Sequence, residues 1–209
     1  LLKPDTTADM IRVLCEEAVE NGFASVCIPP VFVPLAADLL YGSEVAVGTV
    51  AGFPLGYQPA SVKAFEAVEA VARGAHEVDM VINIGLAKEG RLDEVEQEIC
   101  EVVSAAGDAV VKVIIACCLL EEPLKKRLTE RVVAAGAAYV KTSTGFGSGG
   151  ATLMDVKLLA EAAAGRIKVK AAGGIRDWAA CRDFLDAGAN RIGTSGGVAI
   201  MEQWQQEVI

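Results

Sequence analysis

The run Tyr139-Val140-Lys141-Thr142-Ser143-Thr144-Gly145-Phe146 carries a lysine from a β-prone segment into a turn. Tyr139 and Val140 favour a strand, whereas the glycines that follow Thr144 prevent the strand from continuing. Lys141 is therefore predicted to lie near the carboxyl end of a strand. In parallel α/β folds, this end of the sheet carries the chemistry.

A second stretch repeats this pattern. Ile167-Lys168-Val169-Lys170-Ala171-Ala172-Gly173-Gly174 again runs from apolar strand residues through a lysine into glycines. Lys170 follows Lys141 by about the length of one strand-helix-strand unit, roughly 30 residues. We therefore expect the two lysines at equivalent heights on adjacent parallel strands. Two amines in one pocket suggest imine chemistry.

Short strands rich in Val, Ile and Ala alternate with amphipathic helices along the rest of the chain. Such alternation is typical of βα units and a parallel sheet. We expect seven strands, at residues 24–28, 44–51, 77–82, 110–116 and 190–193 and around each of the two lysines. Helices are expected from Thr6 or Thr7 to Gly22, near 35–40, and at 61–73, 92–106, 123–135, 153–164, 178–187 and from 198. In the helix at 61–73, the expected apolar stripe is Ala64, Phe65, Val68 and Val71.

The number of strands bears on how the sheet closes. Seven strands do not close the usual barrel, whereas an eighth before Leu1-Leu2 would complete eight units. A doubly wound open sheet is the alternative. Against it, no GxGxxG motif follows a first strand, and polar residues at strand ends recur around the whole chain. We therefore predict a single-domain α/β fold, a (β/α)8 TIM barrel over residues 1–209, with its first strand truncated at the N-terminus.

Four charged residues mark four successive predicted strands: Asp79, Lys112, Lys141 and Lys170. Buried strands rarely carry charges without partners. A structural ion-pair network that happens to repeat is one interpretation, but four charges in register favour a functional site. Lys112 comes early in its strand and is less expected to contact a substrate than the other three. Lys168 lies nearer the start of the strand of Lys170, and a structural or solvated role is expected for it.

The paired lysines indicate a mechanism in part. A free lysine has a pKa of about 10.4, and desolvation or a neighbouring ammonium group lowers that value. One lysine would then attack a carbonyl as a neutral amine while the other stays cationic. Asp79 would move protons while the carbinolamine forms and breaks down. Spacing alone leaves open which lysine is the nucleophile.

Glycine-rich turns follow the last two predicted strands. Gly173-Gly174 and Gly193-Thr194-Ser195-Gly196 would present backbone N–H groups and a hydroxyl to an anion. In TIM barrels, the loops after the last two strands often form a phosphate site. A substrate with a phosphate group is therefore expected here.

Composition excludes several classes of function. The formal net charge of −9 argues against a nucleic-acid partner, because binding to a phosphate backbone needs a basic face. No apolar run approaches the roughly 20 residues of a membrane span, and no signal peptide is recognisable, so we expect a cytoplasmic protein without a membrane partner. The 6 cysteines form no CxxC pair and there is 1 histidine, so no metal site is expected.

Four runs resemble the deoxyribose-phosphate aldolase family: Val78-Asp79-Met80-Val81-Ile82-Asn83, Lys141-Thr142-Ser143-Thr144-Gly145-Phe146, Lys170-Ala171-Ala172-Gly173-Gly174-Ile175-Arg176 and Ile192-Gly193-Thr194-Ser195. The likeness extends to Leu1-Leu2-Lys3-Pro4 and Ser25-Val26-Cys27-Ile28-Pro29, and so covers nearly the whole chain. It implies a (β/α)8 barrel and a lyase that cleaves 2-deoxy-D-ribose 5-phosphate reversibly into D-glyceraldehyde 3-phosphate and acetaldehyde, without a metal or cofactor.

The resemblance also implies residue roles. Lys141 would form the Schiff base, Lys170 would be the cation that lowers its pKa, and Asp79 would be the acid/base partner. Contacts with substrate or phosphate are implied for Lys112, Thr144, Gly145, Gly173, Gly174, Gly193 and Ser195. The implied partners are a small phosphosugar and aldehydes, with a homodimer as a possible assembly.

The chain departs from the family pattern at three places. Ala116-Cys117 stands where members often carry Glu-Thr, Gly196 stands where a second serine is common, and the aspartate of the first strand is absent before Leu1. Two alternatives follow from these departures. One is a related Schiff-base aldolase with another aldehyde pair, and the other is a phosphosugar-binding barrel with impaired turnover.

Overall fold

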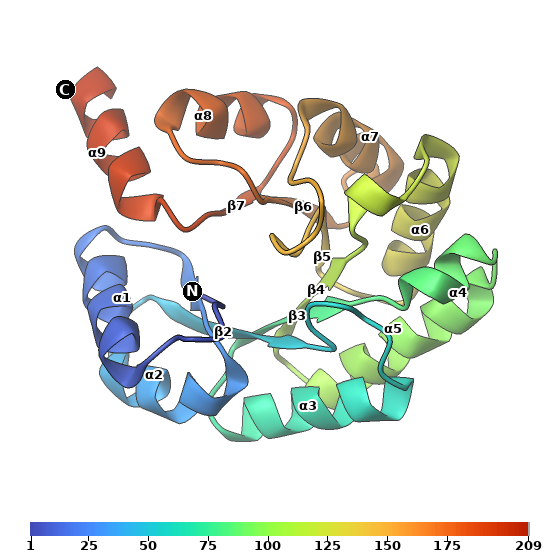
Figure 1. Cartoon of the computed structure of the whole chain (residues 1–209), viewed down its shortest axis with the longest axis horizontal. Coiled ribbons are helices and arrows are strands. Elements are labelled where there is room, and N and C mark those ends of the chain that lie inside the picture. The colour runs from blue at the N-terminus through green and yellow to red at the C-terminus, as the bar shows by residue number, and fades with distance from the viewer. Residues whose placement is uncertain (209) are drawn as a thin grey trace.

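Residues 1–208, which the computed structural model describes, form one parallel sheet of seven strands surrounded by helices (Figure 1). The strands are β1 (Ser25–Cys27), β2 (Ala46–Ala51), β3 (Glu77–Val81), β4 (Val110–Ile114), β5 (Tyr139–Lys141), β6 (Lys168–Ala172) and β7 (Arg191–Gly193). Each strand pairs with the next one in sequence, from β1 to β7. This order has no switch point, so it is the order of a barrel and not of a doubly wound sheet. The predicted TIM-barrel class is confirmed.

The edges of the sheet, β1 and β7, are linked by a side chain. Within residues 1–208 there is no eighth strand between them. The guanidinium Nη1 of Arg191 donates to Ser25 Oγ at 3.0 Å, which connects the two edges. Near the other end of β1, the backbone nitrogen of Leu1 donates to Cys27 O at 2.7 Å, so the start of the chain lies beside this strand (Figure 1). The seven strands thus form a curled, barrel-like sheet.

The expected helices are all present, within a few residues of their predicted bounds. They are α1 (Ala8–Glu20), α2 (Val33–Leu39), α3 (Ala60–Ala72), α5 (Leu92–Ala106), α6 (Glu122–Ala134), α7 (Leu153–Ala163), α8 (Trp178–Asp186) and α9 (Gly197–Val208). An additional helix, α4 (Ile84–Lys88), was not expected. This helix is too short for its apolar residues to show a helical period. The sequence indicates it only through the N-cap residue Asn83, whose Oδ1 accepts a hydrogen bond from Leu86 N at 3.1 Å.

The predicted apolar stripe of α3 was wrong at two of its four positions. Phe65 is 64% exposed and Val68 is 46% exposed, whereas Ala64 and Val71 are partly buried and Val71 packs against the core. The buried residues are instead Lys63, Ala67 and Ala70. Small alanines allow α3 to approach the sheet closely, and the Lys63 stem is apolar while its ammonium finds acceptors inside. The buried face of α3 is therefore lined by small and amphipathic residues and not by its largest apolar ones.

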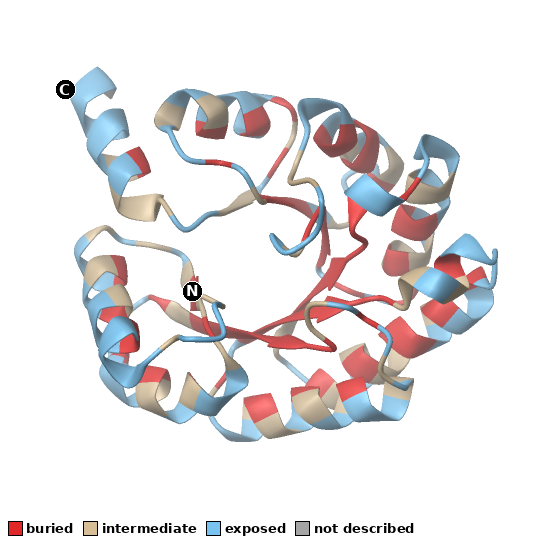
Figure 2. Cartoon of the chain, viewed as in Figure 1, coloured by how far each residue is buried: buried red, intermediate tan, exposed pale blue. Residues whose placement is uncertain are grey.

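Burial follows the layers of the fold. Figure 2 shows that the inner strands β2 to β6 are mostly buried, whereas the edge strands β1 and β7 are only partly buried, and that the helices are buried mainly on the face toward the sheet. All five residues of β3 are buried, as expected for a parallel strand covered on both faces. Two of them, Glu77 and Asp79, carry carboxylates. Because a buried charge is costly unless it is paired, these two residues need partners inside the barrel.

Candidate active site

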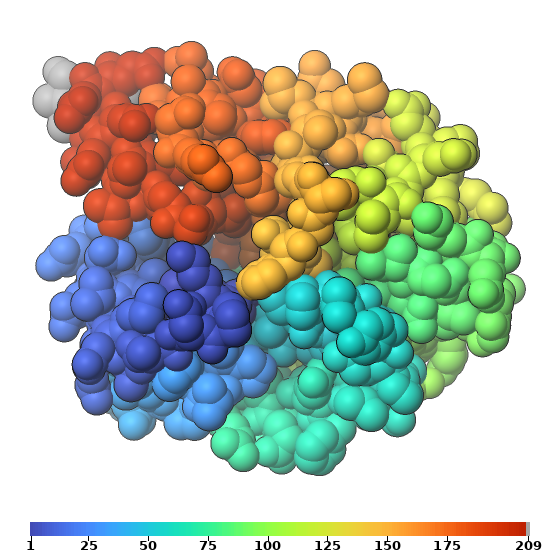
Figure 3. Space-filling model, in the orientation of Figure 1, coloured from blue at the N-terminus to red at the C-terminus, as the bar shows by residue number. Residues whose placement is uncertain are grey.

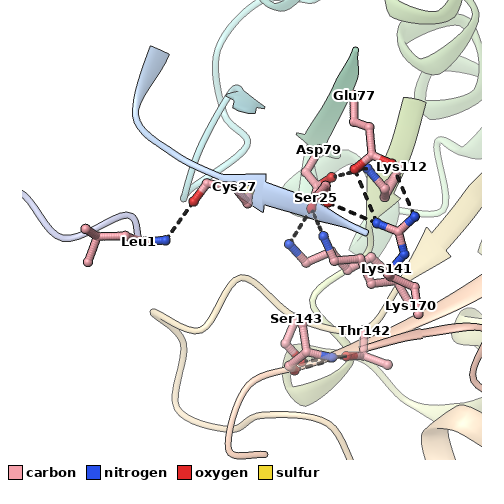
Figure 4. Close-up of polar contacts among 12 residues, drawn as sticks. Leu1, Ser25, Cys27, Glu77, Asp79, Lys112, Lys141, Thr142, Ser143 and Lys170 are labelled. Carbon is pink, nitrogen blue, oxygen red and sulfur yellow. Dashed lines mark hydrogen bonds and ion pairs between the residues drawn. The ribbon is translucent and has the colours of Figure 1, made fainter. Parts of the chain in front are cut away.

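Two lysines share one oxygen of a buried aspartate. The Nζ atoms of Lys141 on β5 and Lys170 on β6 each lie 2.7 Å from Oδ2 of Asp79 on β3 (Figure 4). The other oxygen, Oδ1, accepts from Lys112 Nζ on β4 at 3.1 Å. One carboxylate therefore contacts three ammonium groups, and the four charged residues singled out from the sequence are brought together.

The sheet register explains how these residues meet. Lys141 and Lys170 are Cα partners in the β5–β6 ladder, which places them at equivalent heights as predicted. Asp79 and Lys112 are partners in the β3–β4 ladder, but Lys141 pairs with Ile114, two residues beyond Lys112. The four charges are thus not all in one register. The tilt and stagger of strands in a barrel bring Asp79 to the level of the two lysines.

The surroundings push the pKa values of the two lysines in opposite directions. Burial lowers the pKa of Lys141, and Lys170 adds to this effect, so that the opposing Asp79 does not restore the ordinary value. Burial also lowers the pKa of Lys170, but Asp79, Cys27 and Glu77 raise it by more, and the net shift is upward. When the surroundings move the pKa values of two neighbouring groups apart, the group with the lower pKa can act as the base or nucleophile and the other as the acid.

Asp79 is held as a carboxylate. Burial alone would raise its pKa, but Lys141, Lys170 and Lys112 lower the pKa well below its ordinary value. At neutral pH, Asp79 can therefore accept hydrogen bonds and orient the ammonium groups, but it rarely holds a proton of its own.

Lys112 occupies a different position from that expected of a residue in contact with substrate. Its side chain has no exposed surface, and its ammonium already binds Asp79 and Glu77, the latter at 2.8 Å. This geometry does not favour a direct contact with a phosphate group. Lys168 is exposed, and its Nζ lies 5.7 Å from the ring centroid of Tyr139, in keeping with the structural or solvated role expected for it.

Close backbone approaches shape the turns after β5 and β6. A Cβ atom on Gly150 would lie 2.2 Å from Gly173 O, so only glycine fits there. Ala151 N donates to the same oxygen at 3.0 Å, which ties the two turns together. Thr144 Oγ1 accepts from Phe146 N at 3.1 Å and so holds its own turn.

The remaining expected phosphate residues lie at the same end of the barrel. Gly145 and Gly174 have positive φ angles in the turns after β5 and β6. Gly193, at the end of β7, leaves space for an active-site lysine, because a Cβ atom there would lie 3.1 Å from Lys170 Cε. Ser195 is exposed just before α9.

Two polar residues at the site were not found from the sequence. Thr142 Oγ1 accepts from Ala172 N at 3.1 Å and donates to Ala172 O at 3.2 Å, so it joins the ends of β5 and β6 beyond the two lysines. Glu77 lies two residues before Asp79 on a strand that was expected to be buried. Glu77 could have been predicted as an interior residue, because side chains two positions apart lie on the same face of a strand and Asp79 was already placed inside.

Two aromatic rings meet across the mouth of the barrel. Phe53, after β2, and Phe146, after β5, pack edge to face with their centroids 5.3 Å apart. In the space-filling view, the gold segment after β5 reaches over the middle of this face toward the cyan segment after β2 (Figure 3). The loop that follows Lys141 is therefore fixed against the opposite side of the mouth.

Residues 1–208 contain neither a candidate metal-binding cluster nor a candidate membrane-spanning helix. No set of three or more His, Cys, Asp or Glu side chains is grouped so that it could hold a metal ion. No helix in the described part of the chain is both long and apolar enough to cross a membrane.

Comparisons with known proteins agree with the motifs. The family described as DeoC/LacD family aldolase matches residues 1–206. The deoxyribose-phosphate aldolase of Syntrophotalea carbinolica is 57% identical over 206 residues, which cover 99% of this chain and 93% of that protein. The deoxyribose-phosphate aldolase of Caldanaerobacter subterraneus subsp. tengcongensis is 51% identical over 210 residues, with coverage of 99% and 91%.

A solved structure extends this agreement to the fold. The deoxyribose phosphate aldolase from Aeropyrum pernix, described as a unique tetrameric structure, superposes with a TM-score of 0.92. It is 35% identical, and the match covers 100% of this chain and 88% of that one. The resemblance inferred from the sequence motifs is confirmed, and the chain belongs to the DeoC/LacD family of aldolases.

Proposed function

We propose that this protein is a deoxyribose-phosphate aldolase, an aldehyde-lyase that cleaves 2-deoxy-D-ribose 5-phosphate reversibly into D-glyceraldehyde 3-phosphate and acetaldehyde. The observation that carries the proposal is the pair of lysines on one oxygen of Asp79, each at 2.7 Å, inside a family of aldolases. Lys141 is the nucleophile in this proposal, because its lowered pKa leaves more of the neutral amine at neutral pH. Lys170 has a raised pKa and is an ammonium in the resting protein, ready to donate a proton.

The proposed reaction begins at the aldehyde carbon of the open-chain sugar. The neutral Nζ of Lys141 attacks C1, and the carbinolamine loses water with a proton that Lys170 supplies and Asp79 relays. The resulting protonated imine accepts the electrons of the C2–C3 bond as the C3 hydroxyl gives its proton, through Asp79, to the now neutral amine of Lys170. Glyceraldehyde 3-phosphate leaves, and Lys170 returns this proton to C2 of the enamine. Hydrolysis of the imine then releases acetaldehyde and returns the amine of Lys141.

Asp79 acts in this scheme as a fixed carboxylate. Because three lysines keep its pKa well below the ordinary value, it orients the two reactive nitrogens and passes protons between them. The electron sink is the imine itself, so the proposed reaction is independent of a metal or cofactor.

The phosphate group is proposed to lie at the turns after β5, β6 and β7. The residues proposed to contact it or the sugar are Thr144, Gly145, Gly173, Gly174, Gly193 and Ser195. Their support is a common location at the carboxyl ends of three neighbouring strands, where backbone N–H groups can face an anion. Lys112 is proposed to act through Asp79 and not by touching the substrate.

We also propose a cytoplasmic location and a homodimer. The Aeropyrum pernix relative is described as a tetramer, so the number of subunits needs its own measurement. Sedimentation velocity separates a dimer from a tetramer by mass.

Borohydride trapping tests the proposed chemistry. Incubation with acetaldehyde and borohydride should add one reduced two-carbon group to the protein, and peptide mapping should place it on Lys141. Half-maximal trapping should occur below pH 10.5, the ordinary pKa of a lysine, because the pKa of Lys141 is lowered and the neutral amine appears as the pH rises through it. Lys170→Leu should move this midpoint upward, since the neighbouring ammonium is gone.

Lys168→Gln is the matched control for the trapping experiment. It removes an exposed lysine from β6, the strand of Lys170, and should leave the adduct and its pH midpoint unchanged. An adduct on Lys170, or no adduct at all, contradicts the proposed function.

A further inference from the structure

A series of ion pairs leads from the active-site carboxylate toward the opposite end of the barrel, and all of its members except Arg191 are buried. The ammonium of Lys112 lies between Asp79 Oδ1, at 3.1 Å, and Glu77 Oε2, at 2.8 Å (Figure 4). Glu77 also accepts from Arg191 on β7, with Nη2 to Oε1 at 3.3 Å and Nη1 to Oε2 at 3.4 Å. The proposed mechanism gives no role to Glu77, which is nevertheless buried.

Glu77 shares the interior face of its strand with Asp79. The two residues are separated by one position on β3, and side chains two apart point to the same side of a strand. On the neighbouring strand β2, Gly48 is the Cα partner of Glu77 and lies beside its carboxylate. A Cβ atom on Gly48 would lie 3.5 Å from Glu77 Oε2 and only 2.7 Å from Val26 O.

Charges inside the barrel are not balanced. Four cations, Lys112, Lys141, Lys170 and Arg191, face two carboxylates, Glu77 and Asp79. Other polar or titratable groups lie near these ion pairs: Ser25 and Cys27 on β1, Tyr139 on β5, Lys168 on β6 and the backbone nitrogen of Leu1. No further carboxylate within residues 1–208 forms an ion pair with these four cations. If Glu77 lost its charge, Lys112 would depend on Asp79 alone.

We propose that Glu77 is a positioning residue for the aldolase reaction, which holds Lys112 and thereby leaves Asp79 Oδ2 to be shared by Lys141 and Lys170. This inference rests on the proposed function. Glu77 does not touch the reacting atoms in this role. It acts through the ammonium of Lys112 and through its negative charge, and Arg191 holds its carboxylate in place.

Neutralisation of the Glu77 carboxylate tests the direction in which the pKa values of the two lysines shift. Glu77→Gln keeps the shape and an acceptor oxygen but adds one net positive charge to the interior. Both lysines should then lose their protons at lower pH, so the midpoint of acetaldehyde trapping on Lys141 should fall by about half a unit or more. The kcat for deoxyribose phosphate should fall by about tenfold or more. The KM should change by less than about twofold, because Glu77 does not contact the substrate.

A second variant reverses the sign. Arg191→Gln removes a positive charge from the end of the ion-pair series that lies farthest from Asp79. This change should move the midpoint of acetaldehyde trapping upward. The double variant Glu77→Gln/Arg191→Gln restores the net charge, and its midpoint should return toward that of the wild type. Lys168→Gln removes an exposed charge at the same end of the barrel and should have no effect on the midpoint, because solvent screens it.

The outcomes separate this inference from its alternatives. A loss of thermal stability and kcat in Glu77→Gln with an unshifted midpoint would mean that the ion pairs are only structural, and would overturn the inference. If Glu77→Gln does not fold, an unshifted midpoint in Arg191→Gln overturns the inference and an upward shift supports it. A wild-type protein that traps no acetaldehyde refutes the proposed function, whereas normal trapping in the wild type with unshifted variants refutes the role of Glu77 alone.

Discussion

Removal of one partner from a buried ion pair outside the active site should destabilise the protein by several kcal/mol. Lys63 on α3 has no exposed surface, and it pairs with Glu98 on α5. The same ammonium donates to Gly56 O at 2.5 Å and to Val81 O at 2.8 Å. Oε2 of Glu98 accepts from Asn83 N at 2.9 Å. This cluster therefore connects two helices with the loops that follow β2 and β3, at the mouth of the barrel.

The magnitude follows from what is left behind when the lysine is replaced. Lys63→Met keeps an unbranched apolar stem but leaves the carboxylate of Glu98 buried without its cation. Removal of one partner of a buried ion pair costs about 3–5 kcal/mol. The two carbonyls also lose their donor, and the apolar replacement recovers little of this loss. We therefore expect the free energy of unfolding to fall by about 4 kcal/mol.

Two further variants show whether the charge is the cause. Lys63→Met/Glu98→Gln removes the unpaired charge and keeps an acceptor for Asn83 N, so it should recover at least half of the lost stability. Glu69 and Arg73 form a surface pair on the same side of the barrel, with side chains 45% and 54% exposed. Arg73→Met should cost about 0–1 kcal/mol, because water already solvates the surface pair.

Urea unfolding followed by circular dichroism measures these differences, with the KM as a second readout. Phe53 lies in the loop that Lys63 holds through Gly56, so a looser loop should also raise the KM for the phosphosugar. If Lys63→Met costs less than about 1 kcal/mol, like the surface control, the cluster does not clamp these loops and the reasoning is refuted.

Three further changes test the mouth of the site. Gly193→Ala places a Cβ atom 3.0 Å from Ala172 Cβ and 3.1 Å from Lys170 Cε, so kcat should fall about tenfold or more; an unaltered kcat contradicts the packing argument. Phe146→Ala removes the edge contact with Phe53, which is worth about 0.5–1.5 kcal/mol, and should raise the KM without changing the pH midpoint of trapping. Ser195→Ala should weaken binding of deoxyribose phosphate by about 10-fold or more but that of free deoxyribose much less, because a hydrogen bond to a charged group contributes about 1.5–3 kcal/mol; equal losses refute a phosphate contact.

The strands and most helices could be predicted because each carries its signal locally. Short β-branched runs bounded by glycine or proline are sufficient to identify a buried parallel strand, and all seven were found at or near their expected positions. The lysines and Asp79 were visible because a charge in such a run is uncommon. Their meeting point followed from topology, since the carboxyl ends of parallel strands lie at one end of a barrel.

What was missed depends on contacts between distant residues. The buried face of α3 is set by acceptors for Lys63 that come from residues 56, 81 and 98, and a helical period contains no information about them. Thr142 looks like an ordinary turn residue until β6 is placed beside it. Glu77 stands at the start of its strand, where a charge is usually solvated, and only Lys112 and Arg191 make its burial tolerable.

The identity of the nucleophile shows the same dependence on surroundings. Lys141 and Lys170 are register partners at equal distances from Asp79 Oδ2, so neither spacing nor the shared carboxylate distinguishes them. Burial lowers the pKa of both lysines, and the neighbouring charges decide the net direction for each of them. Glu77 helps to raise the pKa of Lys170, and the ammonium of Lys170 in turn helps to lower the pKa of Lys141. Glu77, at the start of β3, therefore contributes to the proposed division of roles, and its neutralisation should lower the pKa of both lysines together.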